Sequence, residues 1–498
     1  MRTGGGFALA ATAAGLGAGS ALAGSDKWSR LRVALQGDLV TPSDPGYAVS
    51  KQGQFIEYDA VNPVAVAYCE TPEDVQTCVR FSQYNGIPFR VRSGGHNLNG
   101  WSTGQGLVID VSRINHTIVG GSTVRMGPGT QSVDALDALA PYNKQIVTGT
   151  CPTVCAGGFI SGGGVGFQTR KFGTASDRLV SALVVLADGR IVRCSATRDP
   201  ELFWAVRGGG GGNFGVVVDF EVRPIDAPRL VTYNTMWSWD QAAAVLSAWQ
   251  DWTVNASRDL GSTLFVVPPT AGGTGTAPAI RIYGGYHGAQ AGLDGALAEL
   301  VQRAGVQPVS RTTNDSTFAV GMKELYGCGE MTVAQCHRVG SGPEAALYRT
   351  PYQRQSYRMT NRVTNASETA ALVSAYNAQE QIPYRFMQVF ALGGAANDIS
   401  AGATAYVHRD AQFLAGYQSF ALTPDPAPEE VAGHTAWTDN AAAALTPAAS
   451  GSYINFPSSR LNSNWGTANY GGNYSRLRGV KRRYDRGNVF NHPGSVAG

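Results

Sequence analysis

The segments Arg90-Val-Arg-Ser-Gly-Gly-His96-Asn97 and Gly149-Thr-Cys151-Pro-Thr-Val-Cys155-Ala-Gly-Gly158 decide the fold of this chain. Each segment holds a nucleophilic side chain, His96 or Cys151, in a glycine-rich loop. Glycine lets backbone amides approach a flat or phosphorylated ligand closely, because no Cβ intervenes. We therefore expect both loops to lie against one large ligand.

Length and charge set the first limits. A chain of 498 residues is too long for one ordinary core, so it predicts two domains or one domain with large insertions. A net charge of +3 without a basic stripe argues against a nucleic-acid partner. The 63 glycines indicate many tight turns and close backbone approaches, as a large buried cofactor requires.

The first residues are typical of an export signal. Arg2 precedes an apolar run of small residues from Phe7 to Ala23 that ends in Ala-Leu-Ala. The run lacks the bulk of a transmembrane helix, so we expect a signal peptide over 1–23 and a secreted, extracellular protein with no membrane partner. The alternative is a disordered Ala/Gly tail.

The seven cysteines fit an exported protein. Cys69 and Cys78 form one local pair, Cys328 and Cys336 another, and we expect both to be disulfides in an oxidising compartment. Neither pair has metal-ligand spacing, so no metal site is predicted. Free buried thiols are the ordinary interpretation of the remaining three. These are Cys151, Cys155 and Cys194.

Hydrophobic patterns predict an α+β unit in the first part of the chain. A strand at 64–68, a helix beginning at Thr71-Pro72 and a strand at 89–92 follow one another. Thr71 suits a helix N-cap and Pro72 the first turn. Further strands are expected at 106–110, 123–126, 179–186 and 191–194, with a helix near 132–140.

The sequence pattern of expected helices and strands changes near Pro224 and Pro228. Amphipathic helices alternate with strands from there to about Pro428, which predicts a second α+β domain with an antiparallel sheet as one wall of a substrate pocket. Its clearest helices are expected at 241–252 and 293–304, and its clearest strands at 263–267, 280–286 and 384–392.

Five consecutive glycines, Gly208 to Gly212, resemble part of a dinucleotide fingerprint. They lie between an expected helix and an expected strand, whereas the fingerprint lies between the first strand and its helix. We therefore do not assign them to a Rossmann fold.

Chemistry links His96 and Cys151 to a flavin. An imidazole can add at the 8-methyl position of an oxidised flavin and a thiolate at C6, and two such bonds would raise the flavin potential toward hydride acceptance from alcohols. Alone, a His is more often structural and a buried Cys is usually inert. Glycine turns beside both residues favour the flavin hypothesis.

Several further motifs carry a resemblance to a known family. They are Ile160-Ser-Gly-Gly-Gly164, Arg170-Lys-Phe-Gly-Thr-Ala-Ser-Asp177, Leu202-Phe-Trp-Ala-Val-Arg through Gly215, and Tyr470-Gly-Gly-Asn473-Tyr-Ser-Arg-Leu477. With the two nucleophile loops, they resemble the berberine bridge enzyme-like family of FAD-linked oxidases, in the vanillyl-alcohol-oxidase superfamily. The matches extend from about Ala65 to the C-terminus and suggest a bacterial secreted branch.

The resemblance implies an α+β fold with a PCMH-type FAD-binding domain of two α+β subdomains and a helix-covered substrate domain. We expect the FAD domain over 24–225, the substrate domain over 226–435 and a returning segment over 436–498. FAD would be bicovalently bound through His96 (8α-histidyl) and Cys151 (6-S-cysteinyl). The other implied FAD contacts are Arg92, Ser93, Gly94, Gly95, Asn97, Gly157, Gly158, Ser161, Gly162, Gly163, Gly164, Asp177, Gly215, Val216, Tyr470 and Asn473.

The sequence departs from the family pattern at three positions. Cys155 stands where the family has Gly, Phe159 where it has a His that supports negative charge on the flavin, and Phe456 where sugar oxidases have a Tyr base. Tyr453 or Tyr470 is the better candidate for the catalytic base, since a phenolate can take a hydroxyl proton. Packing of the domain interface is an equally good interpretation of Tyr453.

Ala156 occupies the position that controls oxygen access in the family. A small side chain there favours oxidase over dehydrogenase behaviour, although tight packing beside glycines would also select it.

Together these observations predict an FAD-dependent oxidase. It would move hydride from an alcohol, either a sugar or a hydroxylated or glycosylated natural product, to the flavin, with O2 as the final acceptor and H2O2 as product. The alternatives are an oxidative cyclase or dehydrogenase of a secondary metabolite, and a flavoprotein that sequesters a ligand without turnover. A monomer or homodimer is expected.

Overall fold

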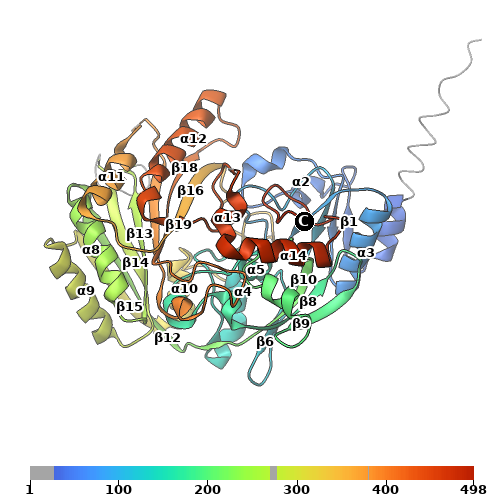
Figure 1. Ribbon diagram of the computed structural model, residues 1–498, viewed down its shortest axis with the longest axis horizontal. Coiled ribbons are helices and arrows are strands. Elements are labelled where there is room, and N and C mark those ends of the chain that lie inside the picture. Colours follow the sequence, from blue (N-terminus) through green and yellow to red (C-terminus); the bar gives the residue numbers. More distant parts are fainter. Residues whose placement is uncertain (1–26, 270–276, 380, 462) are drawn as a thin grey trace, which may run out of the picture.

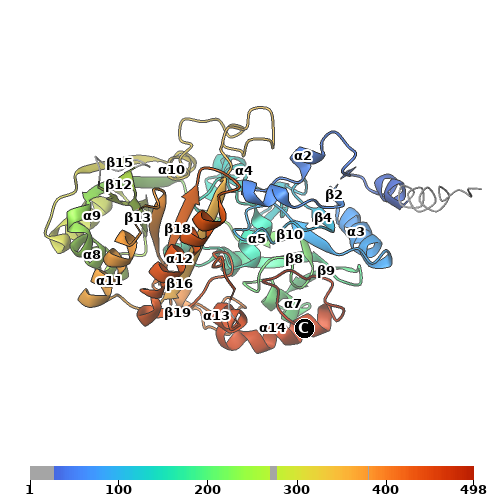
Figure 2. The ribbon, with the colours of Figure 1, turned by 90° about the horizontal axis from the view of Figure 1, so that it is seen from above.

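The computed structural model describes residues 27–269, 277–379, 381–461 and 463–498, so the predicted signal peptide lies outside the described residues. Figure 1 shows two lobes side by side, one built around a large sheet and the other from smaller sheets and both ends of the described chain. Figure 2 shows the same lobes from above.

The first lobe contains a four-stranded sheet in which three strands are parallel. Helix α3 (Pro72–Tyr84) crosses between two of them, and it begins where the Thr71 hydroxyl accepts a hydrogen bond from Asp74 N at 3.2 Å. In spatial order the strands are β1 (Asp38–Val40), β2 (Ala65–Tyr68), β4 (Leu107–Asp110) and β3 (Phe89–Arg92).

An antiparallel five-stranded sheet completes this lobe. In spatial order its strands are β5 (Thr117–Val119), β6 (Val124–Met126), β10 (Val216–Val222), β8 (Leu179–Val185) and β9 (Ile191–Ser195). The C-terminal helix α14 (Tyr474–Tyr484) packs against α7 (Pro200–Ala205), and α13 (Trp465–Tyr470) packs against α14 (Figure 2). The buried Lys481 ammonium binds Asn213 O at 2.8 Å and Asp485 at 2.7 Å, which ties the chain's end to the glycine-rich loop.

The second lobe is an eight-stranded antiparallel sheet. Apolar side chains of one face pack under α8 (Ala242–Asn255), α9 (Gln290–Ala304), α11 (Ala366–Asn377) and α12 (Pro428–Ala443), leaving the other face free to turn toward the first lobe. In spatial order the strands are β15 (Ser310–Thr317), β12 (Arg229–Ser238), β14 (Ala279–Tyr286), β13 (Leu260–Val267), β17 (Arg385–Ala391), β18 (Phe413–Ala421), β16 (Tyr352–Thr360) and β19 (Ala449–Gly451).

The described chain also contains shorter elements. They are α2 (Tyr47–Ser50), α4 (Ser132–Leu139), α5 (Ala156–Ser161), α6 (Thr169–Phe172), α10 (Phe318–Leu325), β7 (Lys144–Gln145) and β11 (Ile225–Asp226). Arg349 pairs with Asp59, and Arg354 pairs with Glu57 at 2.7 Å, so charged side chains also join the lobes.

The predicted fold class is confirmed, with α+β sheets in the first lobe and an antiparallel sheet under helices in the second. The Cys328–Cys336 disulfide is present. The expected Cys69–Cys78 disulfide is absent, because the two Sγ atoms lie 3.9 Å apart, well beyond the roughly 2.05 Å of an S–S bond. No described helix combines the length and apolarity needed to cross a bilayer.

Candidate active site

A cavity of about 500 Å³ lies between the lobes. One wall consists of loops and helix α5 from the first lobe, and the opposite wall is the free face of the large sheet. The two nucleophiles singled out in the sequence, His96 and Cys151, both line this cavity. The fold therefore brings together two segments that are 55 positions apart in the chain.

His96 follows β3 and contacts the loop that contains Cys151. Gly95 has φ +68°, a left-handed conformation that suits glycine and turns the chain into the cavity. His96 Nε2 lies 2.6 Å from the Thr153 hydroxyl. Burial, with a smaller effect of the Arg338 charge, lowers the pKa of His96 to about 4. The imidazole is therefore neutral near pH 7 and keeps a nucleophilic nitrogen.

Cys151 is exposed and lines the cavity. The surrounding protein raises the pKa of its thiol, because desolvation disfavours the thiolate. Cys155, in contrast, is buried. Its Sγ lies 3.2 Å from Gly129 O, and a Cβ added to Gly94 would come within 2.7 Å of it, so Cys155 packs beneath the His96 loop.

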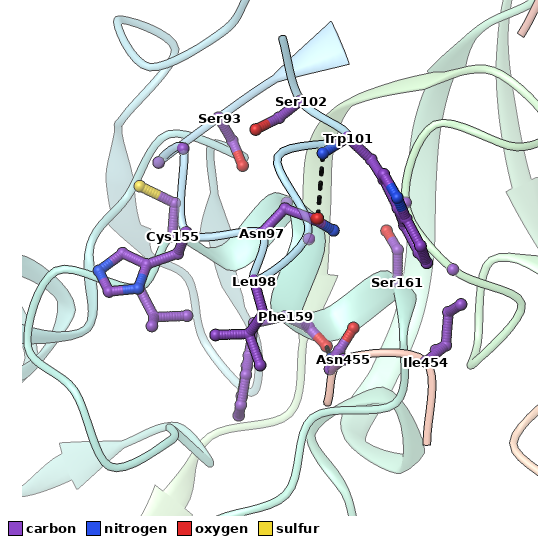
Figure 3. A pocket seen from close by; sticks show the side chains of 18 of the residues that line it. Ser93, Asn97, Leu98, Trp101, Ser102, Cys155, Phe159, Ser161, Ile454 and Asn455 are labelled. Atoms are coloured by element: carbon purple, nitrogen blue, oxygen red, sulfur yellow. Dashed lines mark hydrogen bonds between the residues drawn. The ribbon is translucent and has the colours of Figure 1, made fainter. Parts of the chain in front are cut away.

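Glycines leave space along the first-lobe wall of the cavity. A Cβ added to Gly158 would meet no atom within 4 Å, so any side chain there would project into open space. Gly210, Gly212 and Gly215 all have positive φ and also line the cavity. Figure 3 shows Ser93, Asn97 and Ser161 around this wall, with the Asn97 side-chain oxygen accepting a hydrogen bond from Trp101 N at 3.1 Å.

The structure places many of the predicted FAD contacts on the cavity. They are Ser93, Gly94, Gly95, His96, Asn97, Cys151, Gly157, Gly158, Ser161, Gly215 and Val216. The run from Gly210 to Gly212 also lines it, although these glycines were not among the predicted contacts.

Other predicted contacts have structural partners instead. Arg92 pairs with Asp110 and donates to Ser50 O at 2.6 Å. Asn473 donates to the Ala401 carbonyl at 2.7 Å. An added Cβ would meet Asn455 at Gly162, Tyr406 at Gly163, and Ala175 and Phe159 at Gly164. These five residues do not line the cavity.

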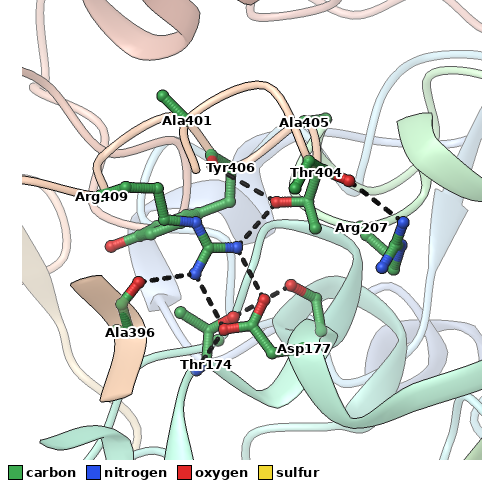
Figure 4. A network of polar contacts seen from close by, with 12 residues as sticks. Thr174, Asp177, Arg207, Ala396, Ala401, Thr404, Ala405, Tyr406 and Arg409 are labelled. Atoms are coloured by element: carbon green, nitrogen blue, oxygen red, sulfur yellow. Dashed lines mark hydrogen bonds and ion pairs between the residues drawn. The ribbon is translucent and has the colours of Figure 1, made fainter. Parts of the chain in front are cut away.

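Asp177 also differs from expectation. Its carboxylate forms a buried, two-pronged ion pair with Arg409, at 2.6 and 2.8 Å, and accepts from Thr174 N at 2.8 Å (Figure 4). Arg409 further donates to Ala396 O and the Thr404 hydroxyl. Asp177 is thus committed to joining the lobes, since a buried carboxylate is stable when it is paired and hydrogen-bonded.

The structure does not bring the predicted bases to the cavity. The Tyr453 hydroxyl accepts from Gly164 N at 2.8 Å, and the Tyr470 hydroxyl donates to Gly209 O at 3.0 Å. Both side chains are fully buried in the core of the first lobe. Burial raises the pKa of each phenol. The packing interpretation of Tyr453 agrees with these contacts.

Phe456, by contrast, does line the cavity. Its ring meets Tyr357 edge-on at 5.1 Å between centroids and Phe390 at 5.5 Å. The Phe456 side chain therefore adds apolar surface to the site and has no proton to exchange.

The sequence missed the side chains of the sheet wall. Alternate residues of five neighbouring strands line the cavity, because successive side chains of a strand point to opposite faces of the sheet. They are Arg281 and Tyr283 on β14, Phe265 on β13, Gln388 and Phe390 on β17, Gln418 and Phe420 on β18, and Gln353 and Tyr357 on β16. The alternation in Arg385-Phe-Met-Gln-Val-Phe-Ala391 was a usable signal, but only the sheet register brings these strands together.

Comparisons with known proteins agree with this geometry. Residues 63–195 match the FAD binding domain family, and residues 452–497 match the family described as berberine and berberine like. The chain is 28% identical over 469 residues to an uncharacterised FAD-linked oxidoreductase, YgaK, of Bacillus subtilis, covering 93% of this chain and 97% of that one.

Two further similarities concern oligosaccharide oxidases. The chain is 28% identical over 465 residues to glucooligosaccharide oxidase of Sarocladium strictum, covering 89% and 88% of the two chains. It superposes with a TM-score of 0.80 on a solved glucooligosaccharide oxidase from Acremonium strictum, at 25% identity over 95% and 99% of the two chains. That relative carries a 6-S-cysteinyl, 8α-N1-histidyl FAD.

Proposed function

Because the chain belongs to the berberine bridge enzyme-like family of FAD-linked oxidoreductases, we propose that it is an alcohol oxidase whose FAD is bound through both His96 and Cys151. The observation that carries this proposal is that both side chains open on one cavity, opposite a sheet rich in polar and aromatic side chains.

The residues present fit FAD. The glycine wall offers backbone without side chains, which suits a flat ring and a pyrophosphate. A neutral His96 and an accessible Cys151 supply the two nucleophiles. When bound, FAD supplies a two-electron acceptor that takes a hydride from the donor carbon and delivers the electrons to O2 as H2O2.

The protein must also accept the hydroxyl proton of the donor. Two tyrosines line the cavity, Tyr283 and Tyr357. The Tyr357 hydroxyl donates to Gln388 Oε1 at 2.9 Å, and burial raises its pKa strongly. Burial raises the pKa of Tyr283 to about 12, and the Arg281 guanidinium, 4.3 Å above its ring, opposes this rise. We assign proton acceptance to Tyr283 Oη, because the Arg281 guanidinium over its ring stabilises the phenolate, whereas the Tyr357 hydroxyl is engaged with Gln388.

Redox balance follows from these roles. The C–H bond of the carbinol breaks as hydride, the O–H proton goes to Tyr283, and the carbinol becomes a carbonyl or a lactone. The two electrons and two protons leave with O2 as H2O2. The sheet wall orients the donor so that its carbinol carbon faces the first-lobe wall.

Export completes the proposal. The apolar run from Phe7 to Ala23 supports secretion, and the Cys328–Cys336 disulfide suits an oxidising compartment. N-terminal sequencing of protein recovered from the medium of the source cells should begin near Gly24.

Peroxide release across a panel of sugars and aromatic alcohols tests the activity. At least one donor should give H2O2 and reduce the flavin when oxygen is excluded. Reduction without peroxide would instead indicate a dehydrogenase or cyclase. An unreduced flavin with every donor would overturn the oxidase proposal and favour ligand sequestration.

A further inference from the structure

The cavity face of the large sheet forms an ordered grid. Phe265 pairs across the strands with both Arg281 and Gln388, and Gln388 pairs with Gly416, which in turn pairs with Tyr357. One row therefore crosses five strands. Because strand residues alternate, Tyr283 lies on the same face two positions from Arg281, roughly 7 Å along β14.

Arg281 is the cationic member of this grid. Its Nε donates to Asn234 Oδ1 at 2.8 Å, and its guanidinium lies over the Tyr283 ring. Among the residues that the structure describes, no carboxylate forms an ion pair with Arg281, and none of the described cavity-lining residues is Asp or Glu.

Two other arginines of the same sheet show a contrast. Arg229 on β12 pairs with Asp315 at 2.8 Å, and Arg354 on β16 pairs with Glu57 at 2.7 Å. Arg281 is half-buried, and its guanidinium contacts a neutral amide and an aromatic ring instead of a carboxylate of the described chain. A charge held in an enclosed site is costly unless a counter-charge completes it.

The surrounding side chains fit a ring that bears polar groups. Phe265 and Phe386 stack at 5.1 Å between centroids, and Phe390 and Phe420 add further aromatic surface. The amides of Gln353, Gln388 and Gln418 lie beside them, and amides can both donate and accept hydrogen bonds.

We propose that Arg281 binds a carboxylate of the alcohol donor, so that the enzyme prefers acidic donors, either sugar acids or aromatic hydroxy acids, over their neutral counterparts. The planar guanidinium fork matches a carboxylate with two parallel hydrogen bonds. This proposal rests on the proposed function for the identity of the donor site, but the binding of the acid is testable without turnover.

Matched donor pairs test the proposal in the purified, flavin-loaded enzyme. D-glucuronate is compared with D-glucose, and para-hydroxymethylbenzoate with para-methylbenzyl alcohol. In at least one pair, kcat/KM should favour the acid by about tenfold to a hundredfold, the range for a charge-assisted hydrogen-bonded pair. The pair that responds identifies the donor as a sugar acid or an aromatic acid.

Variants then assign the preference to Arg281. Arg281→Gln should bring the acid-to-neutral ratio close to one, and Arg281→Lys should leave an intermediate ratio, because lysine keeps the charge but loses the fork. Arg229→Gln removes a cation from the neighbouring strand outside the cavity and should leave the ratio unchanged. An unchanged ratio in Arg281→Gln, or equal use of acid and neutral donors by the parent enzyme, would overturn the proposal.

Calorimetric titration separates this proposal from the oxidase proposal. If no donor gives peroxide, the oxidase proposal fails, but the parent enzyme should still bind one acid at least about tenfold more tightly than its neutral partner. The difference should disappear in Arg281→Gln. Equal binding of acid and neutral compounds would contradict a carboxylate site.

Discussion

The two walls of the cavity are built in different ways. The first-lobe wall is rich in glycines such as Gly158 and carries the two nucleophiles, whereas the second-lobe wall consists of side chains that project from strands. Glycine backbone allows close approach of a flat cofactor. Projecting side chains such as Arg281 and Gln388 would select the donor. Under the proposed function, cofactor attachment and donor choice therefore depend on different walls.

The largest expected effect concerns the cofactor wall. In His96→Ala and in Cys151→Ala, one bond should still hold the flavin to the protein after acid precipitation. In the double variant all flavin should pass into the supernatant, because no covalent bond remains. Absorbance of pellet and supernatant measures this. Free flavin from either single variant would contradict the use of both attachment points.

On the donor wall, Tyr283→Phe should lower kcat by about a hundredfold, the usual scale for loss of a general base. Tyr453→Phe should cost much less, since its hydroxyl is bonded to Gly164 N away from the cavity. Stopped-flow measurement of anaerobic flavin reduction isolates the chemical step. A larger loss in Tyr453→Phe than in Tyr283→Phe would reverse the assignment.

The pH dependence sharpens the same assignment. Tyr283 acts as a base only when deprotonated, and its pKa is raised to about 12. Below that pKa the active fraction grows with pH, so the reduction rate should rise about tenfold per pH unit between pH 7 and 9. The slope should vanish in Tyr283→Phe. A flat profile in the parent enzyme would exclude a phenolate of this pKa as the base.

A smaller effect is expected at Thr153, whose hydroxyl lies 2.6 Å from His96 Nε2. Thr153→Ala should slow flavin attachment a few-fold, about the value of one hydrogen bond, whereas Thr153→Ser should retain the parent rate. Incubating apoprotein with FAD and following the covalent fraction over time measures this. Equal rates for the Ala and Ser variants would show that the contact does not orient the imidazole.

The sequence allowed a close prediction of the fold. The expected helix at 293–304 and strand at 280–286 correspond to α9 and β14, because hydrophobic period and helix caps are local signals. The FAD-linked family and the Cys328–Cys336 disulfide were also predicted correctly. The Cys69–Cys78 disulfide was not, since spacing alone does not fix Sγ geometry.

The site was predicted only in part, because local sequence signals do not reveal tertiary contacts. Loops such as the one around His96 line the cavity with consecutive residues, so a motif reveals them. Arg281, Gln388 and Tyr357 meet only through strand register, which pairs residues far apart in the chain. Asp177 was predicted to contact the cofactor and Tyr453 to act as a base. Arg409 and Gly164 N instead bind their polar atoms away from the cavity, and sequence alone does not reveal such tertiary partners.

The proposed role of the first-lobe wall requires that one flavin is bonded to both nucleophile loops. Proteolysis of the purified enzyme followed by mass spectrometry tests this most directly. We expect the peptide containing His96 and the peptide containing Cys151 to be recovered as one species, joined through a single flavin. Recovery of the two peptides separately, with both side chains unmodified, would contradict this attachment.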